Sequence, residues 1–296
     1  MKAAAEHAIS TFRPGDDVSG VYACVRKDRL IARTGTPYLA LELRDRSGTI
    51  QGRAFTDADA LGARFERGDL VQVTGRIERF RDQLQIDVRS IGQAPAEVAD
   101  PEQFLPVAYR DRDELDGFLE HLAREVHDPD YRRLLDSLLA DGELRNRWRR
   151  APCSRSGHHA YLGGLLEHTV AVATLAYETC QLHLRLNSDL LITAALVHDL
   201  GRVDEFEYGA EITLSDAGRM LGHVELGLRA LDARAKALGM PEEKWLALAH
   251  CVLTHHGPET APQRRFASIE AVALYRLNAV DAGIKAALES GVGLES

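Results

Sequence analysis

Histidine and carboxylate side chains recur along the second half of the chain, inside segments that are otherwise apolar. The string LGGLLEHT contains His168, and the string LVHDLG contains His198 next to Asp199. Further donor side chains follow in LGHVELG, LTHHG and LNAVDAG, namely His223, His255, His256, Asn278 and Asp281. Imidazole nitrogens and carboxylate oxygens bind divalent ions such as manganese, iron, nickel or zinc. One histidine on an apolar helix is usually a packed core residue, but this set predicts a metal centre.

The local patterns indicate how these side chains are positioned. His168 shares one face of its helix with Leu165 and Val172, so it points into a helical core, where an unpaired imidazole is costly. His198 and Asp199 end another apolar helix, and a glycine follows them closely. Adjacent residues of a helix diverge by about 100°, so both reach one ion only near a helix end or a distortion. The glycine makes such an end available.

Length and composition are those of an ordinary globular protein. The chain has 296 residues, of which 45% are hydrophobic and 27% are charged, and this length suggests two domains. No apolar run is long enough to cross a bilayer, and the N-terminus lacks the pattern of a signal peptide. The four cysteines form no CxxC pair, which argues against a zinc ribbon and a disulfide framework. We therefore expect a cytoplasmic protein with no membrane partner.

The charge is unevenly distributed along the chain. The formal net charge is −9, which taken alone argues against a nucleic-acid partner. Residues 1–92, however, carry 15 Lys and Arg against 13 Asp and Glu, whereas the rest of the chain carries 21 against 32. The N-terminal third is therefore locally suited to a polyanion, and the acidic remainder suits a domain that binds cations.

The first third has the pattern of a small β-barrel. Five segments alternate apolar and polar residues, and they are VSGVYACVRKDRLIA, PYLALELRD, TIQGRAF, DLVQVTGRIERF and QLQIDVRSI. A short helical stretch, DADALGARFERG, separates the third from the fourth. This is the order of an OB-fold, which commonly binds oligonucleotides on one face. We expect residues 1–92 to form an OB-fold nucleic-acid-binding domain.

A proline-containing linker at residues 93–110 precedes a helical region over residues 111–296. Apolar residues there recur at i, i+3 and i+4 in seven segments. These are DELDGFLEHLAREV, DPDYRRLLDSLLADGELRNRWRR, LGGLLEHTVAVATLAYETCQ, SDLLITAALVHDLG, LGHVELGLRALDARAKALG, PEEKWLALAHCVLTHH and SIEAVALYRLNAVDAGIKAALE. The expected fold class is therefore multidomain, with a small all-β OB-fold barrel followed by an all-α domain.

The ordered motifs of the helical region resemble those of the HD phosphohydrolase superfamily, whose signature is His, then His-Asp, then Asp. The longer strings GHHAYLGGLLEHT, HDLGRVDEFEY, TLSDAGRMLGHVELG and LTHHG resemble one branch of it, the YhaM family of 3′→5′ exoribonucleases. Members of that branch join an N-terminal OB-fold to an HD domain. The resemblance covers nearly the whole chain and is strongest over residues 157–257.

The resemblance implies metal ligands at His168, His198 and Asp199, with Asp199 bridging if two ions are bound. The additional histidines that match a second-metal set are His223, His255 and His256. An alternative for the 255–256 pair is a helix end whose imidazoles lie near the negative end of the dipole. We expect one or two divalent ions, manganese first, with iron, nickel, cobalt or magnesium as alternatives. Besides His198 and Asp199, we expect Arg202 to act in catalysis by holding a phosphate.

The chain departs from the family pattern at two places. HDLGR carries Arg202 where the family has lysine, which keeps the charge but removes a proton donor near neutral pH. The last metal ligand of the family falls on Asn278 in LNAVDA, and Asp281 lies about one helical turn later. An amide oxygen is a weaker, neutral ligand. Either Asp281 substitutes by a shift, or the site binds metal more weakly, or activity is reduced.

Nucleic-acid contacts are expected on both domains. Aromatic residues of the OB-like part can stack bases, and we expect most of them in the barrel core and one or two exposed. The residues expected to contact nucleic acid are Tyr22, Tyr38, Arg44, Arg53, Phe55, Arg76, Phe80, Arg155, His158 and His159. The run RNRWRR is either a basic ramp towards the metal site or a set of cations that favour a helix C-terminus.

Three functions follow from these patterns. The first is a metal-dependent 3′→5′ exoribonuclease that cleaves single-stranded RNA, or single-stranded DNA, to nucleoside 5′-monophosphates, as the resemblance implies. The second is an HD phosphohydrolase of a nucleotide or cyclic dinucleotide, although such a substrate does not need a nucleic-acid grip. The third is a nucleic-acid-binding protein whose HD site has lost catalysis. The sequence leaves open whether the protein is a homo-oligomer.

Overall fold

A computed structural model describes residues 8–32, 35–95 and 100–290. The chain divides into two compact units. The first consists of the described residues of Met1–Pro106 together with Tyr208–Ile212, and the second contains Val107–Glu207 and the described residues of Thr213–Ser296. Most of the described part of segment 93–110 therefore belongs to the first unit. The short segment Tyr208–Ile212, which comes from the helical part of the sequence, also belongs to the first unit.

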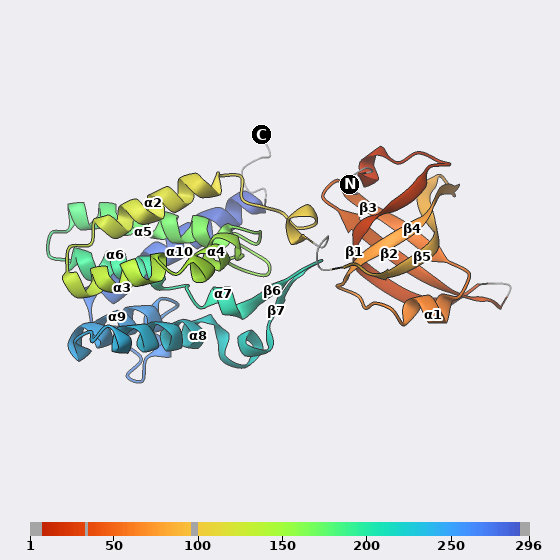
Figure 1. Ribbon diagram of the computed structural model, residues 1–296. Coiled ribbons are helices and arrows are strands. Elements are labelled where there is room, and N and C mark those ends of the chain that lie inside the picture. Colours follow the sequence, from red (N-terminus) through yellow and green to blue (C-terminus); the bar gives the residue numbers. More distant parts are fainter. Residues whose placement is uncertain (1–7, 33–34, 96–99, 291–296) are drawn as a thin grey trace. The chain divides into compact units, whose positions relative to one another are not determined.

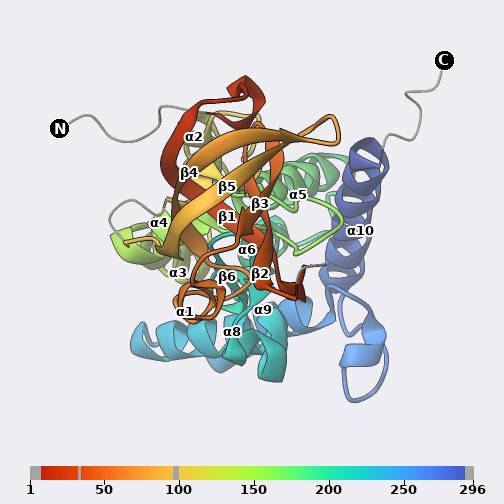
Figure 2. The same cartoon turned by 90° about the vertical axis from the view of Figure 1, so that its right-hand side faces the viewer.

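Five strands close into a barrel in the first unit (Figures 1 and 2). They are β1 (Asp17–Ile31), β2 (Pro37–Asp45), β3 (Gly48–Ala54), β4 (Leu70–Phe80) and β5 (Gln83–Gln93). The strand order around the barrel is β1-β2-β3-β5-β4, and all neighbours are antiparallel except β3 and β5. A single helix, α1 (Ala58–Gly62), lies between β3 and β4 and is shorter than the sequence predicted. The OB-fold class is confirmed.

The alternation of apolar residues decides which side chains fill the barrel. On β2, Leu39, Leu41 and Leu43 are buried, while the residues between them are half-buried. The β4 strand approaches β5 closely at Gly75, where a Cβ atom would lie 2.4 Å from the Asp87 carbonyl oxygen. The register of β4 against β5 shifts at this position, so the glycine lets the two backbones approach closely.

Helices make up most of the second unit (Figure 1). They are α2 (Arg112–Arg124), α3 (Pro129–Leu139), α4 (Gly142–Arg150), α5 (Gly164–Leu182), α6 (Ser188–Val197), α7 (Arg202–Glu205), α8 (Asp216–Ala237), α9 (Glu242–Thr254) and α10 (Ile269–Glu289). Single 3-10 turns lie at Ile9–Thr11 and Pro101–Gln103 in the first unit and at Pro258–Thr260 in the second. Within the described residues, no helix is long and apolar enough to cross a membrane.

Two local features differ from the sequence prediction. The segment 128–150 is not one helix, because Asp141 interrupts it and caps α4 by accepting a hydrogen bond from the Leu144 amide at 3.1 Å. A two-stranded hairpin was also missed. It pairs β6 (Phe206–Tyr208) with β7 (Ile212–Leu214) directly after α7. Strands of three residues carry too little alternation to be recognised.

The helix α6 is the centre of the helical core. Every residue from Leu190 to Val197 is buried, as expected for a helix that is apolar on all sides. The helices α2, α3, α5, α9 and α10 surround it. The Asn187 side chain caps its N-terminus by accepting a hydrogen bond from the Leu190 amide at 3.0 Å. The C-terminal end of this enclosed helix carries His198 and Asp199.

Candidate metal centre

Six of the predicted metal-binding side chains meet where several helices end. His168 lies on α5, and His198 and Asp199 directly follow α6. His223 follows Gly222, whose positive φ of 71° breaks the helical geometry inside α8. His255 and His256 directly follow α9. The side chains of His168, His198, Asp199 and His255 are each no more than 2% exposed.

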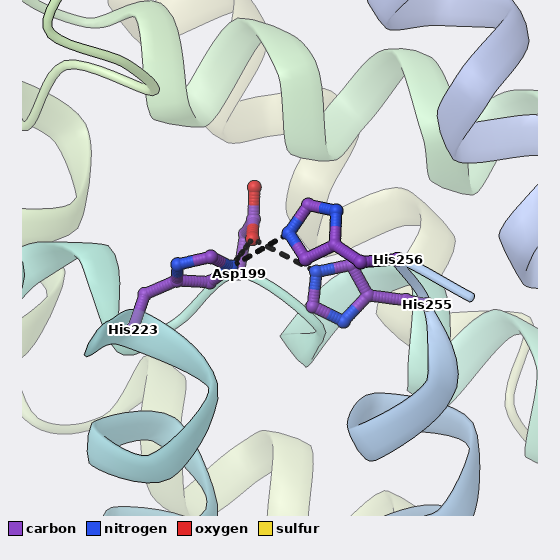
Figure 3. A group of neighbouring side chains, drawn as sticks. All are labelled: Asp199, His223, His255 and His256. Carbon is purple, nitrogen blue, oxygen red and sulfur yellow. Dashed lines mark hydrogen bonds and ion pairs between the residues drawn. The ribbon is translucent and has the colours of Figure 1, made fainter. Parts of the chain in front are cut away.

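Asp199 stands between two groups of imidazoles. On one side, Nε2 of His168 lies 3.2 Å from Nε2 of His198, and each nitrogen lies 3.7 Å from Asp199 Oδ2. On the other side, Asp199 Oδ1 lies 3.2 Å from Nε2 of His223 and 3.4 Å from Nε2 of His255. Figure 3 shows the second group, in which His256 joins His223 with their Nε2 atoms 2.9 Å apart. The ligand atoms of each group lie within 4.8 Å of one another.

Hydrogen bonds on the far side of the rings fix where the ring protons lie. Nδ1 of His198 lies 2.8 Å from the Ala195 carbonyl oxygen, and Nδ1 of His255 lies 2.6 Å from the Val252 carbonyl oxygen. A carbonyl only accepts, so Nδ1 donates in both histidines. With Nδ1 engaged in this way, each ring turns Nε2 towards the cluster.

Two atoms that face the interior of the cluster have no hydrogen-bond partner in the described part of the chain. Asp199 Oδ1 and His255 Nε2 are buried without a hydrogen-bond partner among the described residues. A lone pair and a carboxylate oxygen at 3.4 Å repel one another unless a cation lies close to both. Ligand atoms about 2.1 Å from a metal ion lie roughly 3–3.5 Å apart, which matches the spacings found here. The donor set therefore fits divalent metal ions.

Burial and charge set the protonation states in the cluster. Burial lowers the pKa of His198 well below its usual value and that of His256 to about 3, so both are neutral donors at pH 7. Burial by itself would raise the pKa of Asp199, but Arg202 and the neighbouring histidines outweigh it and hold that pKa well below 3.8. The centre thus combines the ionised carboxylate of Asp199 with unprotonated imidazoles at His198 and His256, which is the state that binds metal.

Arg202 is committed to two carboxylates. Its Nε donates to Asp199 Oδ2 at 2.7 Å and its Nη1 to Glu205 Oε2 at 3.0 Å, and the residue is 8% exposed. The expectation that it also holds a phosphate stays a prediction. In the described structure it positions and neutralises Asp199. Glu205 was missed in the sequence. Glu205 Oε1 accepts a hydrogen bond from the His223 amide at 3.1 Å and lies 3.2 Å from Nδ1 of His223. The sequence feature that could have identified Glu205 is its position about one helical turn after Arg202.

The last metal-ligand position of the family corresponds to Asn278 or Asp281 in this chain, and these two side chains have different contacts. Oδ2 of Asp281 lies 2.6 Å from Nδ1 of His168, on the ring atom opposite the one that faces His198. Asn278 instead donates its amide to the His255 carbonyl oxygen at 3.3 Å. Burial raises the pKa of Asp281, but its contacts with His159 and His168 outweigh burial and lower that pKa overall. Asp281 is therefore placed to orient His168, and Asn278 to support the end of α9.

The histidines before α5 are placed differently from one another. His159 is 2% exposed, and its ring contacts Asp281 at 3.0 Å and the Tyr161 hydroxyl at 2.9 Å. The expected nucleic-acid contact of His159 is therefore wrong, because its ring is enclosed. His158 is half-buried, with its ring centroid 5.4 Å from that of His168. Arg155 is exposed.

The basic run at the end of α4 is neutralised by acidic partners. Arg145 pairs with Asp116 and Glu120, and Arg147 and Arg149 likewise contact carboxylates. Three arginines occupy the last turn of α4, where cations favour the negative end of a helix. The contacts therefore favour the interpretation of this run as cations at a helix C-terminus over that of a basic ramp towards the metal site.

The barrel carries a group of aromatic and cationic side chains that we call the aromatic platform, formed by Tyr38, Arg53, Phe55 and Phe80. The rings of Tyr38 and Phe55 stack with centroids 5.1 Å apart, and the Arg53 guanidinium lies 4.8 Å from the centroid of Phe80. Phe55 is 45% exposed and Phe80 is 43% exposed. The expectation of one or two exposed aromatics is met by these two.

Three other residues expected to contact nucleic acid are placed as follows. Tyr22 is 3% exposed, with its ring in edge-on contact with Phe12, so the expectation for Tyr22 is wrong and it belongs to the barrel core. Arg44 is half-buried and donates to the Ala210 carbonyl oxygen within the first unit, so it is already engaged. Arg76 is exposed on β4.

Gly201 controls the distance between the His198-Asp199 segment and α8. A Cβ atom at this position would lie 2.0 Å from the His223 carbonyl oxygen and 2.4 Å from the Gly227 amide nitrogen. We expect Gly201→Ala to lower the free energy of unfolding by about 1–3 kcal/mol, as overpacking does, and to weaken metal binding through His223. Urea denaturation and metal titration measure both effects. Gly117→Ala is the control, because a Cβ atom there meets nothing within 4 Å in α2, and an equal loss in both variants would contradict the expectation.

Comparison with known proteins agrees with this architecture. The model of the HD domain matches residues 165–283, and the model of an OB-fold nucleic acid binding domain matches residues 21–92. The 3'-5' exoribonuclease YhaM of Oceanobacillus iheyensis is 28% identical over 244 residues, which are 82% of this chain and 76% of that protein.

Two solved structures are similar to a part of this chain. The second OB-fold domain of replication protein A from Methanococcus maripaludis is 24% identical, with a TM-score of 0.25, over 29% of this chain and 92% of that one. A small single-stranded DNA-binding protein from Streptomyces coelicolor is 18% identical, also with a TM-score of 0.25, over 29% of this chain and 97% of that one.

Proposed function

We propose that this chain, which matches the HD domain and an OB-fold nucleic acid binding domain and is similar to the 3'-5' exoribonuclease YhaM, is a metal-dependent 3′→5′ exoribonuclease of the YhaM-like family. It would cleave single-stranded RNA, and single-stranded DNA as a second substrate, to nucleoside 5′-monophosphates. The observation that carries this proposal is the convergence of five imidazoles on the buried carboxylate of Asp199.

We infer that two ions share Asp199. His168, His198 and Asp199 would hold one, and the other would be held by Asp199 with His223, His255 and His256. A centre so rich in imidazole disfavours magnesium, which prefers oxygen ligands, and suits iron, cobalt or nickel, while manganese remains the ion that we expect first. When bound, such ions supply an acidified water as nucleophile and neutralise charge on the phosphoryl oxygens.

The protein itself holds Asp199 and the histidine rings in fixed orientations before metal or substrate binds. Arg202 keeps Asp199 ionised and oriented, since its guanidinium donates directly to the carboxylate. Glu205 and the two carbonyl oxygens behind His198 and His255 hold the rings with Nε2 inward. No donor needs to reorient when substrate arrives, which is the condition under which electrostatic stabilisation is strongest.

Single-stranded nucleic acid would bind to the aromatic platform of the barrel. Two exposed phenylalanine rings, with the Arg53 cation over the ring of Phe80, offer stacking surfaces and positive charge to bases of any sequence. Arg76 and Arg81 add positive charge on β4 and at the turn that follows it. A processive exonuclease needs such a sequence-independent grip.

Phe55→Ala and Phe80→Ala should each weaken binding of an RNA oligomer by ~1–3 kcal/mol, the cost of losing one stacked base. The physical reason is that each exposed ring offers one stacking surface. Fluorescence anisotropy with a labelled oligomer measures the change in Kd. Phe118→Ala is the matched control, because Phe118 is 41% exposed on α2 and also lies near an arginine. Equal weakening in all three variants would remove the platform from the binding surface.

The proposed activity is tested with a 5′-labelled RNA oligomer that ends in a free 3′-hydroxyl. With manganese, we expect progressively shorter labelled products and release of nucleoside 5′-monophosphates, and EDTA should stop both. Metal-loaded protein that leaves the oligomer intact would refute the proposal. Faster hydrolysis of a mononucleotide or cyclic dinucleotide than of the oligomer would instead favour the small-substrate phosphohydrolase.

A further inference from the structure

One buried thiol lies against the metal centre and has no role in the proposed reaction. Cys153, in the segment between α4 and α5, is 0% exposed, and its Sγ lies 3.6 Å from Asp199 Oδ2. Together with His158 and His168 it forms a group whose three ligand atoms lie within 4.8 Å of one another. This group contains sulfur, whereas the two groups around Asp199 contain only nitrogen and oxygen donors.

The segment is folded so that positions 153 and 158 face the same space. The Cys153 amide donates to the His159 carbonyl oxygen at 3.1 Å, and the Ser154 hydroxyl donates to the His158 carbonyl oxygen at 2.7 Å. These two bonds close the segment into a small ring. Nδ1 of His158 is buried and has no hydrogen-bond partner among the described residues, so a lone pair or proton there is left unsatisfied in the protein alone.

We propose that Cys153, His158 and His168 form a separate site for a thiophilic divalent ion such as zinc. One thiolate and two imidazoles are a common zinc donor set, with a fourth position left for water. Binding breaks the S–H bond of Cys153, forms a sulfur–metal bond and releases the proton to solvent, without change of oxidation state. Manganese and magnesium do not favour sulfur, so the site distinguishes soft from hard ions.

The shared ligand gives this site a consequence for activity. His168 belongs both to this group and to the group with His198 and Asp199. Its Nδ1 donates to Asp281, so only Nε2 can bind a metal, and it binds one ion at a time. A zinc ion held by Cys153 therefore takes His168 away from the catalytic set and inhibits the enzyme. This consequence, unlike the site itself, rests on the proposed nuclease function.

Cobalt(II) tests the site without any measurement of activity, because a cobalt–thiolate bond gives an intense near-ultraviolet absorption band. Titration of metal-free protein with cobalt should produce that band in the wild type and in Cys180→Ser. Cys180 is a matched buried thiol at the other end of α5, about 18 Å from His168 along the helix. The band should be absent in Cys153→Ser and weakened in His158→Gln. A band that persists in Cys153→Ser, or no band in the wild type, would overturn the proposal.

Zinc inhibition of the manganese-supported reaction supplies the second readout. Cys153→Ser should need at least about 100-fold more zinc for half inhibition, because loss of a direct ligand costs no less than loss of a group that orients one, which costs about 10–100-fold. Serine keeps a hydrogen-bond donor towards Asp199, so a role limited to that bond predicts no change in zinc sensitivity. A cobalt–thiolate band in a protein without nuclease activity would leave the site standing and refute only the proposed function.

Discussion

Asp199→Asn is expected to lower kcat/KM on an RNA oligomer by roughly a thousandfold, which corresponds to ~4 kcal/mol of transition-state stabilisation. The carboxylate lies between both groups of imidazoles, with Oδ2 facing one and Oδ1 facing the other. An amide keeps the volume but removes the charge that both ions would share. The metal content of the purified variant should fall together with its activity. Mass spectrometry of metals and steady-state kinetics measure the two losses.

Asp204→Asn is the matched control for this variant. Asp204 undergoes the same chemical change five residues later, but its side chain is 44% exposed and pairs with Arg147 outside the cluster. We expect nearly unchanged activity, since exposed ion pairs contribute little. Circular dichroism checks that both variants are folded. Full metal content in an inactive, folded Asp199→Asn protein would mean that Asp199 acts on substrate and not as a shared ligand.

Asp281→Asn is expected to weaken metal binding by about 10–100-fold, the usual cost of losing the group that orients a ligating histidine. The Asp281 carboxylate only accepts, so His168 donates through Nδ1 and keeps the lone pair of Nε2 towards His198. An amide can turn its NH₂ group towards His168 and move the ring proton to Nε2, where it blocks the metal. Metal titration of the apo protein measures the affinity.

Asn278 provides the opposite expectation. Its amide donates to the His255 carbonyl oxygen, so Asn278→Ala should cost ~1 kcal/mol of stability, the value of one hydrogen bond, and leave metal affinity within a few fold. If Asn278 instead occupies the family's ligand position, Asn278→Ala abolishes metal binding and Asn278→Asp strengthens it. That result would assign the fourth anchor to residue 278 and contradict the role given to Asp281.

Local patterns were sufficient to predict the two architectures. Alternation over segments such as PYLALELRD predicts a strand with one buried face, and the β2 strand has its leucines inward. The run LLITAALV predicts an enclosed helix for the same kind of reason, and α6 is buried throughout. Such patterns are readable because burial follows from periodicity within one element. The β6–β7 hairpin was not readable, since three-residue strands depend on pairing across the turn.

The sequence by itself determined that imidazoles and carboxylates gather in an HD-type helical region, because residue types and their order are local information. Only the tertiary structure decided what each one does. In the tertiary structure, Asp281 contacts His168, Asn278 donates to a backbone carbonyl and Arg202 donates to Asp199. Cys153 lies in one group with His158. Two of these contacts join residues that are distant in the chain, with His168 and Asp281 113 residues apart and His255 and Asn278 23 residues apart. Directionality at that range is set by the packing of helices against one another.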